Sequence, residues 1–341
     1  MSEKFPYNIS PLDASINREL LEYFGGRKTG FVQVGPKKYL LPQKYTRHAN
    51  EFYNFELRKD DLWIVTFPRS GTSLTQELLW LINNDLDYNT SAKVPLIERF
   101  PFFEFNIISD DEFLQELAEL NGHSPQAMKE IKARNTPGYE IGPTMKSPRH
   151  FKTHLPLSLL PLKLLDTCKV VYVARNPYDV SVSFYHHNKR TRAHDFKGNF
   201  NKYWEFFEKD LVVYTPYWQH IQEGWQFKDH PNLLFLYYEN LIKDKPSVIR
   251  QIGKYMNKEL SEDDINKLIN HIDYDNFQRN VTLMRNSGIT GLVNKVAEPK
   301  QRGTIGGKEE FGVDNELKHR ADQWFIKNSS QIGVEFPTSN P

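Results

Sequence analysis

The segment Leu62-Trp-Ile-Val-Thr-Phe67, followed at once by Pro68-Arg-Ser-Gly-Thr-Ser73, decides the fold. Its first half is an apolar run of strand length, and its second half is a short loop rich in hydroxyl side chains. Apolar residues then recur at helical spacing, at Leu74, Leu78, Leu81 and Ile82. We therefore predict a strand, a tight loop and a helix from residue 73 to about residue 84.

The same order of a strand and then a helix recurs twice. Val170-Val-Tyr-Val-Ala174 precedes a helix that begins near Pro177, and Leu233-Leu-Phe-Leu-Tyr-Tyr238 precedes a helix over about 247–255. Both runs are apolar at consecutive positions, which is typical of parallel strands covered by helices on both faces. We predict an α/β fold in which residues 1–341 form a single domain, its core at about 40–325, with a central parallel sheet flanked by helices.

Three further segments carry weaker patterns. Ser261 with Asp264 predicts a capped helix that runs to about His271. Residues 110–132 are helical in composition. Residues 279–312 are rich in Gly, Asn, Arg and Lys without a clear period, and we predict that they are mostly loop.

Composition limits the function classes. The chain has 341 residues, of which 39% are hydrophobic and 26% charged, and its net charge is +1. This predicts a globular protein without a general attraction to nucleic acid or membranes. The single cysteine, Cys168, excludes an intrachain disulfide and a multi-thiolate metal site. Because no stretch resembles a signal peptide or a membrane helix, we expect a cytoplasmic protein.

The first loop has the features of an anion site. Gly71 permits close approach of the backbone, Arg69 adds charge, and the loop opens a helix whose free N–H groups favour a phosphate. The hydroxyl groups that are able to donate to phosphate oxygens are those of Ser70, Thr72 and Ser73. The alternative is that the loop merely links a strand to a helix.

Two positions distinguish this loop from the nucleotide triphosphate loop Gly-x-x-x-x-Gly-Lys-[Ser/Thr]. Thr66 stands in place of the first Gly, and Thr72 stands in place of the Lys. In addition, the second strand ends at Arg175, where a metal-dependent phosphoryl transferase usually has an Asp for Mg²⁺. These differences disfavour a nucleotide kinase.

Arg175 is itself a candidate ligand for a second phosphate, with Ser183 two turns along the following helix. A salt bridge at the end of the strand is the alternative role for Arg175.

Lys152 and His154 are candidates for the chemistry. They alternate in Phe151-Lys-Thr-His-Leu-Pro156, so on an extended segment their side chains share a face. A neutral imidazole near phosphate sites is able to take a proton from a hydroxyl nucleophile. His186 and His187 lack a third ligand at metal spacing, and we interpret them as ordinary helix residues.

Together these motifs resemble the cytosolic sulfotransferases, and the resemblance covers roughly residues 40 to 325. The motifs that carry it are Thr66-Phe-Pro-Arg-Ser-Gly-Thr-Ser73, Lys152-Thr-His-Leu-Pro156, Val171-Tyr-Val-Ala-Arg-Asn-Pro177, Val182-Ser-Phe-Tyr-His-His187, Phe235-Leu-Tyr-Tyr-Glu239 and Arg302-Gly-x-x-Gly306. The family implies one α/β domain and in-line transfer of a sulfuryl group from 3′-phosphoadenosine 5′-phosphosulfate (PAPS) to an acceptor hydroxyl or amine. The product is 3′,5′-adenosine bisphosphate (PAP), and no metal is required.

The resemblance also implies roles for individual residues. His154 is implied as the base that deprotonates the acceptor, with Lys152 beside it. The implied ligands of the 5′-phosphosulfate are Arg69, Ser70, Gly71, Thr72 and Ser73. Those of the 3′-phosphate are Arg175, Ser183, Arg302 and Gly303, and those near the adenine are Leu74, Tyr238 and Phe277.

The chain departs from the family pattern at four places. Arg69 replaces the usual Lys, and because a guanidinium does not release a proton we expect it to act as an electrostatic clamp. Leu74 replaces an aromatic residue. The late Gly-rich motif is one residue short before Lys308. The usual dimer segment corresponds only loosely to residues 308–316, so a homodimer is possible but its mode is open.

The acceptor is less constrained. The pattern Arg69-Ser-Gly-Thr72 followed by Thr75-Gln-Glu-Leu-Leu-Trp-Leu-Ile-Asn-Asn-Asp85 is similar to the insect-type branch, which includes a retinol dehydratase. We expect a small hydrophobic alcohol, phenol or steroid-like acceptor. The candidate pocket residues are Phe100, Phe103, Tyr139 and Tyr217, which otherwise are ordinary core. The alternative functions are a dehydratase that eliminates sulfate from a transient ester, and a non-catalytic nucleotide-binding protein.

Overall fold

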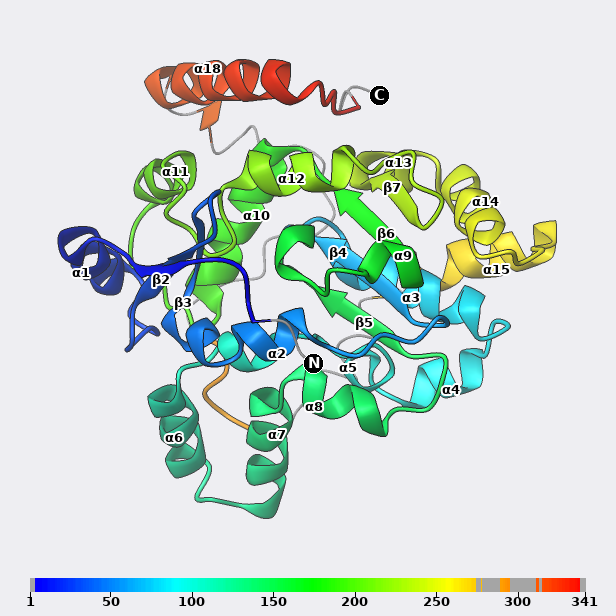
Figure 1. The fold of residues 1–341 in the computed structure, drawn as a ribbon, viewed down its shortest axis with the longest axis horizontal. Coiled ribbons are helices and arrows are strands. Elements are labelled where there is room, and N and C mark those ends of the chain that lie inside the picture. Colours follow the sequence, from blue (N-terminus) through cyan, green and yellow to red (C-terminus); the bar gives the residue numbers. More distant parts are fainter. Residues whose placement is uncertain (1–3, 274–276, 278–288, 295–310, 313–314, 338–341) are drawn as a thin grey trace.

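The structure is a computed structural model that describes residues 4–273, 277, 289–294, 311–312 and 315–337. At its centre lies a parallel sheet with the strand order β5-β4-β6-β7 (Figure 1). Its strands are β4 (Leu62–Thr66), β5 (His150–Thr153), β6 (Lys169–Ala174) and β7 (Leu233–Tyr237). A second, antiparallel sheet consists of β1 (Ile9–Pro11), β2 (Phe31–Val34) and β3 (Tyr39–Pro42). The predicted α/β class with a central parallel sheet is confirmed.

Helices connect the strands and cover the sheet. Before β5 they are α1 (Ala14–Tyr23), α2 (Ala49–Tyr53), α3 (Thr72–Asn83), α4 (Tyr88–Lys93), α5 (Leu96–Arg99), α6 (Asp111–Leu120), α7 (Pro125–Asn135) and α8 (Gly138–Ile141). After β5 they are α9 (Leu164–Thr167), α10 (Pro177–Arg190), α11 (Phe200–Glu208), α12 (Tyr217–Trp225), α13 (Tyr238–Lys243), α14 (Lys245–Tyr255), α15 (Glu262–His271) and α18 (Asn315–Ile332). Short 3₁₀ turns lie at Gln43–Arg47, Phe105–Ile107, Gly142–Thr144 and Leu157–Leu159.

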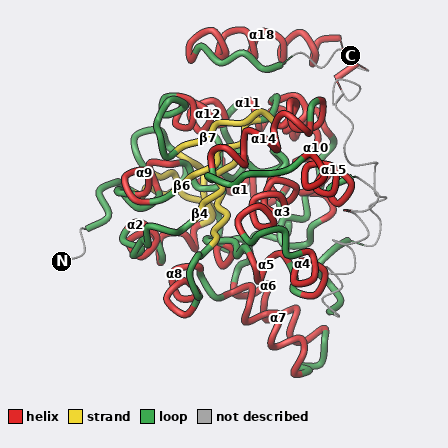
Figure 2. Tube along the Cα trace, turned by 90° about the vertical axis from the view of Figure 1, so that its right-hand side faces the viewer, coloured by secondary structure: helices red, strands yellow, loops and turns green. Residues whose placement is uncertain are grey.

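Both faces of the central sheet are buried, as the consecutive apolar residues predict. On β4, Leu62 and Ile64 belong to a core that includes α3, α14 and α15. Trp63 and Val65 belong to a second core with residues of α2, α10, α11 and α12 on the opposite face. The edge-on view of Figure 2 shows the strands between these two layers of helices. The carboxyl ends of β4, β5 and β6 therefore lie close together, between the two cores.

The structure differs from the sequence prediction in two segments. The residues after β7 form an additional helix, α13, which begins at Tyr238 and precedes α14. Residues 110–132 divide into α6 and α7, because Gly122 and His123 take positive φ values of 60° and 50° between them. These two helices project from the body of the protein (Figure 1).

Other local predictions are confirmed. The helix predicted after the first loop is α3, and the capping box of Ser261 and Asp264 begins α15, which ends at His271. Most of the segment 279–312 lies outside the described residues.

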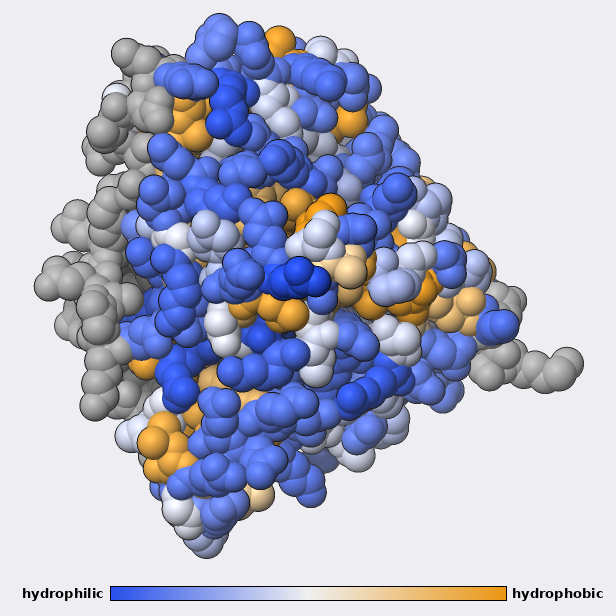
Figure 3. Space-filling model, turned by 90° about the vertical axis from the view of Figure 1, so that its left-hand side faces the viewer, coloured by the Kyte–Doolittle hydropathy of each residue, from blue (hydrophilic) through white to orange (hydrophobic). Residues whose placement is uncertain are grey.

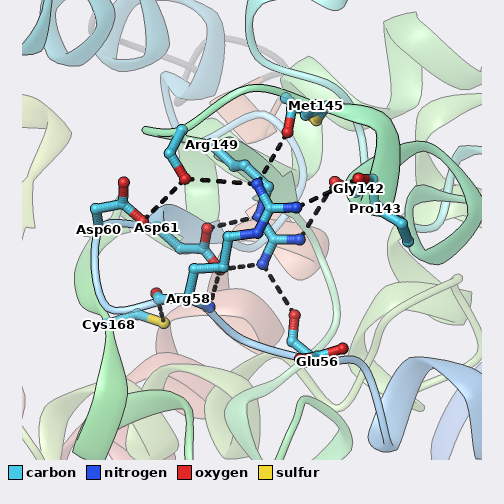
Figure 4. Close-up of polar contacts among 10 residues, drawn as sticks. Glu56, Arg58, Asp60, Asp61, Gly142, Pro143, Met145, Arg149 and Cys168 are labelled. Carbon is cyan, nitrogen blue, oxygen red and sulfur yellow. Dashed lines mark hydrogen bonds and ion pairs between the residues drawn. The ribbon is translucent and has the colours of Figure 1, made fainter.

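A buried ion pair holds the amino end of the sheet (Figure 4). The guanidinium of Arg149, which directly precedes β5, donates to both carboxylate oxygens of Asp61 at 2.7 and 2.6 Å. It also donates to the carbonyl oxygens of Gly142 and Glu56 at 3.2 and 2.9 Å. The thiol of Cys168 lies nearby, and burial raises its pKa to about 12. This end of the sheet is thus closed by internal hydrogen bonds.

The face drawn in Figure 3 is mostly hydrophilic, and its hydrophobic residues form small separate groups. Within the described part of the chain, no helix is both long and apolar enough to cross a membrane.

Candidate active site at the carboxyl end of the sheet

The loop between β4 and α3 has a backbone that suits an anion. Arg69 and Gly71 both take positive φ, 72° and 86°, and α3 begins at the next residue, Thr72. Among the described side chains none caps the first turn of α3, so its N–H groups are available to a ligand. A Cβ atom at Gly71 would lie 2.3 Å from the Tyr238 ring. Only glycine therefore suits this position, on both conformational and steric grounds.

The hydroxyl groups of the loop differ in their partners. Thr72 Oγ1 is 2.8 Å from Thr66 Oγ1, so these two side chains satisfy each other. Ser70 is fully buried, and its Oγ has no hydrogen-bond partner among the described residues. A buried hydroxyl without a partner is destabilising, and a ligand oxygen would supply the missing acceptor.

Arg175, after β6, and Ser183, on α10, both contact Arg69 of this loop. Arg175 Nη1 donates to the carbonyl oxygen of Arg69 at 2.8 Å, and its guanidinium lies 4.4 Å from the centroid of the Tyr238 ring. Arg69 Nε donates to Ser183 Oγ at 3.0 Å, across to α10. Arg175 is buried, and its Nε has no partner among the described residues. The sequence-predicted residues are thus neighbours, although Ser183 contacts Arg69 rather than Arg175.

His154 lies at the end of β5, beside this loop. Its Nδ1 is 2.8 Å from the carbonyl oxygen of Thr66, which only accepts hydrogen bonds. The proton of the neutral ring is therefore on Nδ1, and Nε2 carries the lone pair. Burial, reinforced by the positive charge of Lys152, lowers the pKa of His154 well below its ordinary value. The ring is neutral at pH 7.

Aromatic rings surround the imidazole. The ring of Phe102 is edge-on to His154, with centroids 5.1 Å apart, and it stacks on Phe105 at 5.4 Å. Lys152 Nζ lies 4.3 Å from the same Phe102 ring, and Tyr214 lies 5.6 Å from His154. Lys152 and His154 thus share a neighbour, in agreement with the face predicted from their alternation.

The family model for the sulfotransferase domain matches residues 59–333 of this chain. The chain belongs to the sulfotransferase family. Among curated relatives it is 29% identical to the luciferin sulfotransferase of Photinus pyralis, over 97% of this chain and 87% of that protein. It is 33% identical to sulfotransferase 1A1 of Canis lupus familiaris, over 86% of this chain and 92% of that protein.

Solved structures give the same result. The chain is similar to retinol dehydratase in complex with retinol and PAP, with a TM-score of 0.91, 31% identity, and coverage of 98% and 100% of the two chains. It is similar to retinol dehydratase in complex with androsterone and the inactive cofactor PAP, with a TM-score of 0.88, 31% identity, and coverage of 98% and 99%. The predicted family and branch are confirmed. The protein is a sulfotransferase that uses PAPS as co-substrate.

The described part of this sulfotransferase holds no group of three or more His, Cys, Asp and Glu side chains arranged for a metal ion.

The aromatic residues that we predicted for an acceptor pocket are Phe100, Phe103, Tyr139 and Tyr217, and they differ in burial. Phe100 and Phe103 are fully buried in the two cores, and Tyr217 is fully buried with its hydroxyl on the Arg175 carbonyl oxygen. Tyr139 is half-buried, and its hydroxyl is 2.8 Å from His48 Nδ1. In this structure the first three pack within the cores.

Strand pairing explains this difference. Residues 101–103 lie alongside β5: Lys152 N donates to Pro101 O at 2.9 Å, and Phe103 N donates to Lys152 O at 2.8 Å. Phe102 therefore lies beside Lys152 and faces the base, whereas Phe103 faces the core. Sequence reasoning chose Phe103 for the acceptor pocket, because it lacked the strand pairing that places Phe102 beside Lys152. It also did not predict the contacts of Thr66, Glu104 and Tyr214 with His154.

The remaining predicted donor residues are only partly described. Leu74 is half-buried against the core of α3, and Ser73 is half-buried in the first turn of the same helix. Phe277 N donates to the carbonyl oxygen of Asp273 at 2.8 Å. Arg302, Gly303 and Lys308 lie outside the described residues.

Proposed function

We propose that this sulfotransferase transfers the sulfuryl group of PAPS to the hydroxyl of a small hydrophobic alcohol, phenol or steroid-like acceptor, with His154 as the general base. The observation that carries the proposal is the state of His154: a neutral, buried imidazole whose Nδ1–H is held by the Thr66 carbonyl and whose Nε2 is left to accept a proton. A general base needs this tautomer and orientation before the acceptor arrives.

The proposed donor site includes two buried polar atoms, Ser70 Oγ and Arg175 Nε, that have no hydrogen-bond partner among the described residues. We assign the 5′-phosphosulfate to the loop from Arg69 to Ser73, where the Ser70 hydroxyl and the first amides of α3 suit phosphate oxygens. We assign the 3′-phosphate to Arg175 and Ser183, because the buried Nε of Arg175 has no hydrogen-bond partner within the described part of the chain. Arg302 and Gly303 are proposed to complete that site.

The adenine is assigned to Tyr238, Phe277 and Leu74. When bound, PAPS supplies the sulfuryl group and a phosphate that accumulates negative charge as it leaves.

The protein's own groups then act at two places. His154 Nε2 accepts the proton of the acceptor hydroxyl, and the Thr66 carbonyl stabilises the resulting imidazolium through Nδ1–H. Arg69 and the loop amides stabilise the developing charge on the leaving phosphate without proton transfer, since a guanidinium does not deprotonate near neutral pH. We expect Lys152, which lies on the same side as His154, to add positive charge there.

The acceptor class follows from the surroundings of the base. Phe102, Phe105 and Tyr214 offer aromatic surface next to His154, which favours a hydrophobic molecule that carries its hydroxyl toward Nε2. The names of the similar proteins agree with this class: one is called a luciferin sulfotransferase, and the retinol dehydratase structures contain retinol or androsterone.

The test combines binding and turnover. Calorimetry should give micromolar or tighter binding of PAP, and weaker binding of ADP and of ATP with Mg²⁺. With an acceptor found by screening, His154→Ala should lower kcat by at least about 100-fold and leave PAP affinity nearly unchanged. His319→Ala, an exposed histidine on α18, is the control. A His154→Ala enzyme that keeps more than about a tenth of the rate would exclude His154 as the base.

The likeness to retinol dehydratase favours a second candidate outcome for the same site. The enzyme would form the sulfate ester and then eliminate sulfate, giving a dehydrated product. All donor-site residues would be shared. Mass spectrometry of the product distinguishes the two: a stable ester supports simple transfer, whereas an alkene with free inorganic sulfate supports dehydration.

We also propose a cytoplasmic location, in keeping with the buried free thiol of Cys168. A homodimer is the assembly that the family resemblance implies, and sedimentation equilibrium of the full chain decides between it and a monomer.

A further inference from the structure

A buried carboxylate that the proposed mechanism does not use lies directly against His154. Glu104 is fully buried, and its Oε1 accepts a hydrogen bond from the His154 backbone N–H at 2.7 Å. Its Oε2 accepts from Thr153 Oγ1 at 2.7 Å, and Tyr214 OH donates to Oε1 at 3.3 Å. All three donors belong to residues at or beside the proposed base.

Burial of the Glu104 carboxyl group is energetically unfavourable. Burial raises the pKa of Glu104 to about 7, although the hydrogen bonds from His154 and Thr153 and the positive charge of Lys152 favour its ionised form. A carboxyl group in a protein interior is unfavourable unless each oxygen is well bonded. An apolar side chain would avoid this cost but would leave the buried N–H of His154 without its acceptor, so the glutamate is explained by the groups that it bonds and not by packing alone.

The backbone carbonyl of His154 also has a buried hydrogen-bond partner. His220 Nε2 is 2.9 Å from the His154 carbonyl oxygen, so it carries the proton and donates. The hydroxyl of Tyr172 is 2.6 Å from His220 Nδ1, which fixes the orientation of that ring. Buried side chains thus bind both the N–H and the C=O of His154, while Thr66 binds its ring.

Glu104 also lies between the aromatic residues that surround the base. Phe102 and Phe105, which flank it in sequence, stack on each other, and Phe102 packs against the His154 ring. A single side chain therefore joins the end of β5 to the segment that carries the proposed acceptor wall.

We propose that Glu104 is a positioning residue that holds His154 and the Phe102–Phe105 wall in register, so that the acceptor hydroxyl meets Nε2. This inference rests on the proposed role of His154. Small misplacements of a reacting group lower the rate strongly, because the bound geometry must be close to that of attack.

The test is Glu104→Gln, which keeps the shape but replaces one acceptor oxygen by an NH₂ group that faces a donor. We expect kcat to fall about 10- to 100-fold while the PAP dissociation constant and the KM for PAPS stay within about twofold. Glu77→Gln is the matched control, because Glu77 on α3 is also a buried carboxylate. Its partners are Ser91, Arg99 and His271. It should lower stability but leave kcat within about twofold.

A double mutant separates a positioning role from a general structural one. Because Glu104 acts through His154, Glu104→Gln should have little further effect on kcat in the His154→Ala background. The ¹⁵N spectrum of histidine-labelled protein gives a second readout: the His154 ring should show the Nδ1–H tautomer in the wild type and a mixture of tautomers in Glu104→Gln.

The outcomes are distinct. If His154→Ala remains active, the proposed function fails, whatever Glu104 does. If His154→Ala is inactive but Glu104→Gln keeps wild-type kcat, or changes KM for PAPS rather than kcat, or leaves the His154 tautomer unchanged, the positioning role of Glu104 is overturned and the base stands.

Discussion

Two buried arginines occupy opposite ends of the central sheet and differ in how they are bonded. Arg149, before β5, is 2% exposed and has two carboxylate oxygens and two carbonyl oxygens as acceptors. Arg175, after β6, is 8% exposed, donates to one carbonyl oxygen, and has an Nε without a described partner. Each guanidinium nitrogen of Arg149 therefore donates a hydrogen bond, whereas Arg175 Nε has no acceptor among the described residues.

This difference in hydrogen bonding indicates that the two ends of the sheet have different roles. At the amino end every acceptor of Arg149 comes from the protein, so the interaction stabilises the fold. At the carboxyl end the buried Ser70 hydroxyl also lacks a partner among the residues that the structure describes, and Arg69 and Gly71 hold positive φ. Buried polar groups without hydrogen-bond partners, and strained backbone, reduce stability unless a ligand supplies the missing interactions. A doubly phosphorylated nucleotide is the ligand that we propose for these groups.

The largest expected effect is on stability at the amino end. Arg149→Met removes the cation and leaves Asp61 buried without its partner, so the free energy of unfolding should fall by about 3–5 kcal/mol. Urea denaturation measures this, and PAP affinity of the folded enzyme serves as the control. A variant as stable as the wild type would contradict the proposed difference between the two arginines, because Arg149 would then not stabilise the fold.

The matched change at the carboxyl end should act on binding instead. Arg175→Met should weaken PAP by about 1.5–3 kcal/mol, the contribution of a charged hydrogen bond, and should hardly change the binding of 5′-AMP. The free energy of unfolding without nucleotide should stay within about 1 kcal/mol of the wild type. Calorimetry with both nucleotides is the measurement, and equal losses for both would remove Arg175 from the 3′-phosphate site.

A smaller effect is expected at Ser70. Ser70→Ala should cost about 0.5–1.5 kcal/mol of PAP affinity, the net value of one hydrogen bond. Without nucleotide the variant should be as stable as the wild type or more so, because a buried hydroxyl without a described partner is removed. A clear loss of stability would mean that Ser70 is bonded within the protein and would weaken the comparison between the two ends.

The last expected effect concerns pH. Burial, with the charge of Lys152, lowers the pKa of His154, so the ring protonates only in acid. If the neutral ring is the base, kcat/KM should be constant near neutrality and should fall only well below pH 6.5, the ordinary histidine value. Rates measured between about pH 5 and pH 8, with stability checked at each pH, test this. An acidic limb at or above pH 6.5 would contradict it.

Much of the fold follows from local sequence patterns. The apolar runs of β4, β6 and β7, and the helical spacing after the first loop, depend on residues adjacent in the chain. They predict these elements to within one or two residues. The additional helix α13 was not predicted, because Tyr238 continues the apolar run of β7 and only the structure shows where the chain turns.

The site was predicted in part for the same reason. Lys152 and His154 share a face because alternation is a local property of an extended chain. The pocket prediction named Phe103 and not Phe102, because which of them faces the base depends on pairing with β5, about 50 residues away.

The sequence by itself determined the class of fold, the loop that we propose for the 5′-phosphosulfate, the family motifs and the identity of the chemical groups, because each is encoded in short patterns of residue type and spacing. Only the tertiary structure decided which groups meet: Arg175 with the Arg69 carbonyl, Arg69 with Ser183, and Glu104 with the backbone of His154. These contacts join residues that are 50 to 114 positions apart. They depend on the order of the strands and the register of their pairing, which a pattern of hydrophobic residues does not specify.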